Sequence, residues 1–153
     1  MGLDMYLYKK HYVKNWDFMK DSEKHSVVVT KGGLPTNIQP ERVSEVTEQV
    51  GYWRKANAIH KWFVDNVQDG IDDCGEHYVG QESLQKLLAV VTRLLETKSV
   101  EDAIRELPTQ SGFLFGNTSY DDWYFRDLQT TKDILTTLLA ENGSGELYYH
   151  SSW

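Results

Sequence analysis

The segment 53–67 combines an apolar helical stripe with polar side chains that are able to bind a ligand. Apolar residues recur there with a period near 3.6, so the spacing predicts a helix. Asn57 and His60 fall on the stripe, beside Trp53. A polar group on a core-facing stripe must be hydrogen-bonded, either to other groups of the protein or to a ligand. Arg54 lies one position off the stripe, where it could offer a cation to a phosphate.

A second candidate element is the loop LPTQSGFLFG, residues 107–116. Gln110 and Ser111 bring hydrogen-bonding side chains, Gly112 allows backbone amides to approach a ligand closely, and Phe113 offers a ring for stacking. The loop is no Walker motif, because no Gly-Lys-Ser/Thr follows its glycines. The alternative is a loop that its phenylalanines simply hold in place.

The longest predicted helix, residues 120–141, carries a carboxylate where its stripe would place an apolar residue. Asp127 in that position could accept hydrogen bonds from His60, from Arg54 or from ligand hydroxyls such as those of a ribose. Trp123, near the start of the helix, could stack on a base. The alternative is a carboxylate at the edge of the helix, paired with lysine or water.

Together these elements offer aromatic rings, a cation, amide groups and a carboxylate, which are the groups that recognise a nucleotide or an ADP-ribose-like molecule. Rings would stack on the base, the arginine would meet a phosphate, and the carboxylate would bind the ribose. The alternative is that the same side chains satisfy one another in a packed core. We predict one ligand-binding site built from Trp53, Arg54, Asn57, His60, Gln110, Ser111, Gly112, Phe113, Trp123 and Asp127.

A tight group of reactive side chains follows the first helix, at Asp72, Asp73, Cys74 and His77. A metal site would need further ligands, and the chain has no second cysteine, so we predict neither a metal nor a cofactor. A thiol nucleophile next to His60 or His77 is an alternative, but neighbouring carboxylates disfavour a thiolate. We therefore assign no catalytic residue.

Composition restricts the functions that this chain can have. The 153 residues include 16 Lys or Arg and 23 Asp or Glu, for a net charge of −7. The absence of a basic stripe argues against general nucleic-acid binding, and the absence of a run of about 18 apolar residues argues against a membrane span. The start of the chain lacks the pattern of a signal peptide, and a single cysteine fits a reducing compartment, so we expect a cytoplasmic protein.

The hydropathy pattern predicts a single α+β domain over residues 1–153, with three main helices packed on a small, mainly antiparallel sheet. The strands are predicted at 2–8, 26–30, 77–79 and 147–150, with a strand or an extended lead-in at 43–50. The helices are predicted at 53–67, 81–97, 100–107 and 120–141.

Three blocks of sequence resemble a family of small uncharacterised phage and prophage proteins: GLDMYLYKKHYV, VGYWRKANAIHKWFVDNVQDGIDDC and LPTQSGFLFGNTSYDDWYFRDL. The resemblance covers the start of the chain and most of residues 50–128. It implies a phage-encoded protein of the host cytoplasm, and it carries over no catalytic residues. A looser analogy of context links small phage proteins to counter-defence, where some of them sequester nucleotide immune signals.

We therefore hypothesise a counter-defence protein that binds and sequesters a small nucleotide-derived immune signal, cyclic ADP-ribose-like or a cyclic nucleotide, without turnover. Burial between subunits would slow the release of the ligand, so we expect a homo-oligomer with the terminal strand LYYHSSW as a subunit contact. Two alternatives stay open. One is an inhibitor of a host defence enzyme that uses its acidic C-terminal third, and the other is a small hydrolase of a nucleotide signal.

Overall fold

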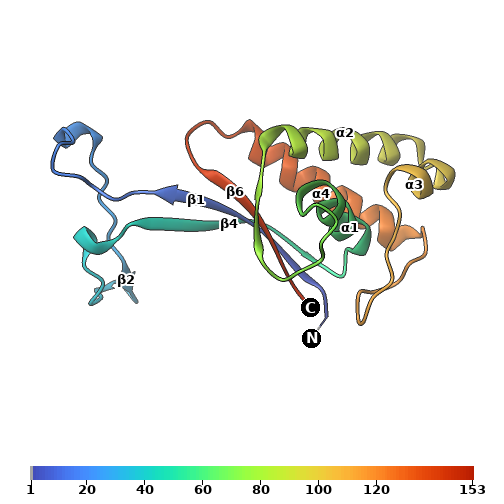
Figure 1. The fold of residues 1–153 in the computed structure, drawn as a ribbon, viewed down its shortest axis with the longest axis horizontal. Helices are drawn as coiled ribbons and strands as arrows, with labels where there is room; N and C mark the ends of the chain where they lie inside the picture. Colours follow the sequence, from blue (N-terminus) through green and yellow to red (C-terminus); the bar gives the residue numbers. More distant parts are fainter. Residues whose placement is uncertain (1) are drawn as a thin grey trace.

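A four-stranded antiparallel sheet with the strand order β4-β1-β6-β5 forms the centre of the molecule (Figure 1). The computed structural model describes residues 2–153. Side chains alternate along β1, so Met5 and Leu7 are buried under the helices while Tyr6 and Tyr8 stack on the other face. The strands of this sheet are β1 (Asp4–Tyr12), β4 (Glu45–Arg54), β5 (Glu76–Val79) and β6 (Glu146–Ser152).

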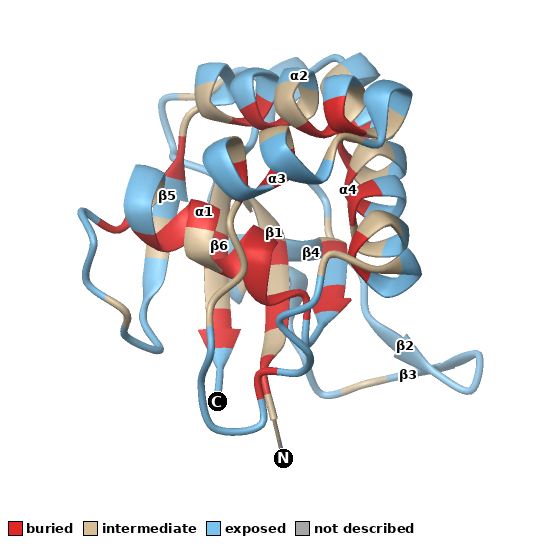
Figure 2. Cartoon of the chain, turned by 90° about the vertical axis from the view of Figure 1, so that its right-hand side faces the viewer, coloured by how far each residue is buried: buried red, intermediate tan, exposed pale blue. Residues whose placement is uncertain are grey.

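The helices cover one face of this sheet (Figure 2). α2 packs along α4, while α1 contacts α4 and β5. Their apolar stripes supply buried side chains such as Leu87, Leu128 and Leu135 to the core. This arrangement confirms the predicted α+β class. The helices are α1 (Asn57–Val67), α2 (Gln81–Thr97), α3 (Val100–Glu106) and α4 (Asp122–Ala140).

The first helix begins four residues later than predicted. Trp53 and Arg54 are the last residues of strand β4. Lys55 then adopts a left-handed conformation with a φ of 57°, which occurs neither in a strand nor in a right-handed helix. The prediction was wrong here because Trp53 occupies a buried position that suits the helical period and the inner face of a strand equally well. The tryptophan therefore reaches the core from the sheet, and Asn57 is the first residue of α1.

The predicted strand over 26–30 is wrong except for its last residue. β2 (Thr30–Lys31) and β3 (Leu34–Pro35) form a small separate hairpin around Gly32 and Gly33, which both have positive φ values. β-branched residues alone do not make a strand where no neighbouring strand lies beside them. Two short 3₁₀ helices, Asp21–Glu23 and Pro40–Arg42, belong to the same part of the chain.

The terminal strand β6 lies inside the sheet, between β1 and β5. Both edges of residues 147–150 are paired within the chain, so this part of the predicted subunit contact LYYHSSW offers no free strand edge. In the described part of the chain, no helix has both the length and the apolar character that a membrane span requires.

Candidate functional site

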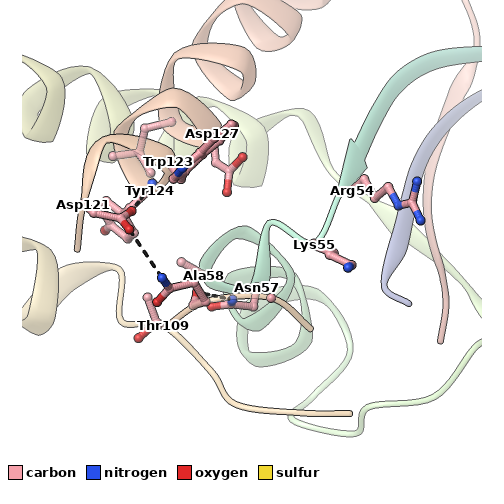
Figure 3. A pocket seen from close by; sticks show the side chains of 12 residues that line it. Arg54, Lys55, Asn57, Ala58, Thr109, Asp121, Trp123, Tyr124 and Asp127 are labelled. Atoms are coloured by element: carbon pink, nitrogen blue, oxygen red, sulfur yellow. Dashed lines mark hydrogen bonds between the residues drawn. The ribbon is translucent and has the colours of Figure 1, made fainter. Parts of the chain in front are cut away.

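A cavity of about 390 Å³ opens between the end of β4, the start of α1, the loop 107–121 and the first turns of α4 (Figure 3). Its size lies in the range of small-molecule sites, which is roughly 300–1,000 Å³. Its walls are made by Arg54, Lys55, Asn57, Ala58, Thr109, Gly116, Asn117, Asp121, Trp123, Tyr124, Asp127 and Leu128.

Four of the ten predicted site residues line this cavity, namely Arg54, Asn57, Trp123 and Asp127. They come from two of the three segments that the sequence analysis had selected, 53–67 and 120–141, although Arg54 belongs to strand β4 and not to a helix. The other six predicted residues do not line it. The cavity is therefore displaced from the centre of the predicted site toward the start of α4.

Asp127 is the most unusual side chain in the cavity. Its carboxylate is half-buried, and within residues 2–153 it has no hydrogen-bond or ion-pair partner, since only its backbone carbonyl accepts a bond, from Thr131. Burial, together with the nearby charge of Asp121, raises the pKa of Asp127 to about 6, and Arg126 only partly opposes the shift. A desolvated carboxylate without a partner is ready to accept hydrogen bonds from a ligand.

Trp123 forms the rim of the cavity, one turn of helix before Asp127. Its side chain is 65% exposed, although a tryptophan is usually well covered. The Arg126 guanidinium lies over its ring, 4.5 Å from the ring centroid, and restricts the motion of the indole. The indole is therefore in place to stack on a planar ligand group at the mouth of the cavity.

Two basic residues, Arg54 and Lys55, line the side of the cavity that lies opposite Asp121 (Figure 3). Arg54 contributes to this wall, but Figure 3 shows its guanidinium turned toward β1, where its Nε lies 4.0 Å from an Asp4 carboxylate oxygen. Lys55 has no carboxylate of residues 2–153 within 4.0 Å of its ammonium group, but Figure 3 shows this group turned away from Asp127 and Trp123. Its chain carbons line the cavity, and its Cε lies beside Gly2.

The amino end of α1 faces the same cavity through Asn57 and Ala58. Its N-cap residue is Ala56, which has no side-chain oxygen, and within the described chain no side chain caps this helix. The helices α3 and α4, by contrast, are capped by Ser99 and Asp121. The free amide groups of the first turn of α1 add partial positive charge to the wall that Lys55 occupies.

The Asn57 side chain is hydrogen-bonded to the loop 107–121 and is therefore not free to bind a ligand. Its amide nitrogen donates to the carbonyl oxygens of Phe115 at 3.1 Å and Asn117 at 2.9 Å, and its amide oxygen accepts from the Gln110 N–H at 3.0 Å. These three bonds use most of the hydrogen-bonding capacity of one amide. Asn57 therefore holds the loop 107–121 over the start of α1.

The remaining predicted loop residues do not form a wall of this cavity. Phe113 is 84% exposed and contributes to a separate hollow near the chain termini, together with Trp153. Gly112 packs against the ring of Phe115, because a Cβ at this glycine would come within 2.5 Å of that ring. Ser111 is exposed. Phe115, which is buried against the His60 ring, anchors the loop in place of Phe113.

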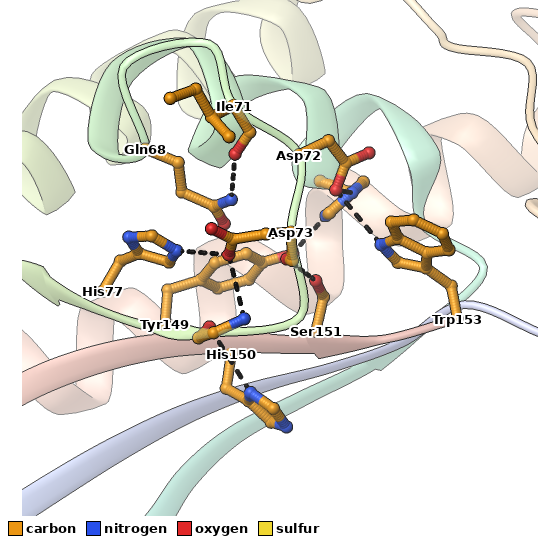
Figure 4. A network of polar contacts seen from close by, with 11 residues as sticks. Gln68, Ile71, Asp72, Asp73, His77, Tyr149, His150, Ser151 and Trp153 are labelled. Carbon is orange, nitrogen blue, oxygen red and sulfur yellow. Dashed lines mark hydrogen bonds and ion pairs between the residues drawn. The ribbon is translucent and has the colours of Figure 1, made fainter.

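His60 belongs to a sealed polar network that also includes Asp72 and Tyr149 (Figure 4). Its side chain has no exposed surface, and its ring nitrogens lie 2.6 Å from the Tyr149 hydroxyl and 3.0 Å from an Asp72 carboxylate oxygen. Burial lowers the pKa of His60 despite the nearby carboxylate, so the ring is neutral. Nε2 then donates to Asp72, and Nδ1 accepts from Tyr149.

The network also explains what Asp72 does. Its carboxylate accepts a second hydrogen bond, at 3.1 Å, from the indole Nε1 of Trp153. The histidine side chain thus joins α1 to the loop after it and to β6 (Figure 4). Because no space is left around His60, the prediction of one pocket in which Trp53, His60 and Phe113 converge is wrong.

Trp53 is sealed in the same way. Its side chain is buried, and its indole nitrogen donates to the Thr131 hydroxyl at 2.9 Å. That hydroxyl in turn donates to the backbone carbonyl of Asp127. Trp53 therefore supports the helix that carries the cavity carboxylate, but it does not line the cavity.

The reactive side chains at positions 72–77 include one close contact between an imidazole and a carboxylate. The His77 imidazole lies 2.6 Å from the Asp73 carboxylate, and this contact lowers the pKa of Asp73. Cys74 is exposed beside it. Across residues 2–153, no group of three or more His, Cys, Asp or Glu side chains is arranged to hold a metal ion.

Comparison of this chain with protein-family models, with curated proteins and with solved structures gave no match. The functional argument therefore depends on the geometry described above.

Proposed function

We propose that this protein is a binding protein for a small nucleotide-derived molecule, which it holds in the cavity beside α4 without turnover. The unpartnered carboxylate of Asp127 in an open cavity carries the proposal. A carboxylate that has been partly removed from water and given no partner costs folding free energy, and a ligand with hydroxyl groups would supply the missing hydrogen bonds.

The distribution of chemical groups around the cavity favours a ligand with three distinct parts. Trp123 at the rim supports a planar base, and Asp127 supports a ribose, whose hydroxyls donate to a carboxylate. The uncapped amino end of α1 supports a phosphate or pyrophosphate on the opposite wall. A cyclic nucleotide and a cyclic ADP-ribose-like molecule both combine these parts.

The resemblance to phage proteins gives this binding a biological setting, which is the sequestration of a nucleotide immune signal of the host. Sequestration needs tight binding and no chemical step. We assign no nucleophile and no acid–base pair to the cavity. Its one perturbed carboxylate suits recognition of hydroxyl groups without a second catalytic group.

Isothermal titration of the full chain with a panel of cyclic nucleotides and ADP-ribose isomers tests the proposal. We expect submicromolar binding of at least one compound, which should be recovered intact after the protein is denatured. Absence of heat with every compound would reject the proposal. Recovery of an altered compound would replace it with the hydrolase alternative.

Three variants locate the binding site. Asp127→Asn and Trp123→Ala should each weaken binding at least about tenfold, or ~1.4 kcal/mol. Phe113→Ala is the matched control, because this aromatic residue is even more exposed but lies outside the cavity. Unchanged binding in Asp127→Asn and Trp123→Ala would show that the ligand binds elsewhere.

A further inference from the structure

Residues 14–44 form a projecting arm between the end of β1 and the start of β4 (Figure 1). The last hydrogen bond at its base joins the Val13 N–H to the Ser44 carbonyl at 2.9 Å. Beyond this bond, no residue of the range 14–44 is buried. The arm therefore adds nothing to the core of its own chain.

The arm is nevertheless rich in large apolar side chains. Phe18 is 86% exposed, and Val28 and Leu34 are both 69% exposed. Trp16 stacks on Phe18 with a centroid separation of 6.4 Å, so two aromatic rings form one exposed surface. Exposed apolar clusters of this kind mark sites of protein–protein contact.

Local hydrogen bonds give the arm a defined shape. The Asn15 side chain exchanges two hydrogen bonds, both of 2.8 Å, with the backbone of His25, and the Thr36 hydroxyl donates to the Val29 carbonyl at 2.7 Å. Ordering a residue costs about 1–2 kcal/mol of backbone entropy, which burial of apolar surface normally offsets. Within its own chain the arm lacks that burial, and a second molecule would supply it.

The distribution of charge identifies the second molecule. The arm contains five Lys or Arg and four Asp or Glu, whereas the other residues contain eleven and nineteen. The net charges are therefore +1 for the arm and −8 for the remainder. Four acidic side chains in the arm disfavour nucleic acid, and the acidic body of another copy of this chain is the complementary surface.

We infer that the arm of one chain docks on the acidic body of a second copy, and that the exchange of two arms makes a two-fold dimer. Phe18 and Leu34 are the apolar anchors of this contact. Lys14, which lies over the Trp16 ring at 4.4 Å, places a cation at its rim. The inference does not depend on the ligand proposed above, because no residue of the arm lines that cavity.

Light scattering after size-exclusion chromatography of the full chain tests the inference. At about 100 µM, far above a micromolar dissociation constant, we expect twice the mass of one chain. The double variant Phe18→Asp and Leu34→Asp should raise the dissociation constant at least about 100-fold, so the mass at the same concentration should fall clearly below that of a dimer. Both positions are exposed, so circular dichroism should show an unchanged fold.

The matched control is Ile104→Asp, which places the same charge on an exposed apolar position of α3. This variant should remain a dimer. A monomeric unmodified chain at about 100 µM would overturn the inference, and so would a double variant that stays dimeric. A dimer that α3, not the arm, holds together would be revealed by dissociation of the Ile104 variant.

Discussion

The His60 network and the Asp127 cavity treat a polar side chain in opposite ways. His60 is fully buried and both of its ring nitrogens have partners. Asp127 is half-buried and its carboxylate has none within the described chain. The difference teaches that a polar residue on an apolar stripe indicates a ligand only where the neighbouring elements leave it unsatisfied.

Their neighbours explain the contrast. The loop after α1 returns across His60 and supplies Asp72, while β6 supplies Tyr149 from the sheet. The loop before α4 is instead held to α1 by Asn57, so it covers the start of α1 and leaves Asp127 open. One region uses its polar groups for the stability of the fold, and the other keeps one free.

The largest change in stability should come from His60→Ala. This variant removes a packed ring and leaves the buried Tyr149 hydroxyl without a hydrogen-bond partner, so we expect the free energy of unfolding to fall by about 3–4 kcal/mol. Urea unfolding measures the change. His77→Ala is the control, since its contact with Asp73 is exposed to solvent and contributes little to stability. Similar losses in the two variants would contradict the contrast between a sealed and a surface histidine.

A smaller loss should follow from Thr131→Val. The side chains are alike in shape, but the valine leaves the buried indole N–H of Trp53 without an acceptor, which costs about 1–2 kcal/mol. Thr130→Val, at the exposed neighbouring position, should change the stability by less than about 0.5 kcal/mol. Thermal unfolding of both variants decides whether Trp53 belongs to the sealed region.

Asp127→Asn should increase the stability of the protein, in contrast to the two variants above. At pH 7.5 the variant removes a desolvated charge that lacks a partner, so we expect the free energy of unfolding to rise, by up to about 1 kcal/mol. Asp133→Asn is the exposed control and should stay within about 0.5 kcal/mol of the unmodified chain. A clear loss of stability in Asp127→Asn would mean that the carboxylate has a partner in the folded protein.

The two regions should also differ in their dependence on pH. The pKa of Asp127 is raised from 3.8 to about 6 in the fold, so its contribution is complete below pH 3.8 and is lost as the pH rises through 6. The pKa of His60 is lowered below 6.5, so its contribution is complete above pH 6.5 and is lost as the pH falls.

Urea unfolding at pH 4.5–7.5 separates these opposing effects. Replacement of Asp127 by Asn should make the unfolding free energy rise more steeply with pH, because only the His60 effect remains. An unchanged slope would show that the pKa of Asp127 is ordinary in the folded protein.

The amino-acid sequence by itself determined the α+β class, the positions of α2, α3 and α4, and the elements that surround the cavity. Hydrophobic periodicity decides these features, because it reports which face of an element must be buried. It does not report what packs against that face. Trp53 shows the limit, since one buried position fitted both a helix and the inner side of a strand.

Only the tertiary structure decided which polar groups are left free. His60 and Asp127 occupy comparable positions on their stripes, yet their fates depend on Asp72, Tyr149 and the loop held by Asn57, which lie far away in the chain. Hydrogen bonds between such distant groups form only when the elements pack, so the local spacing of residues cannot predict them.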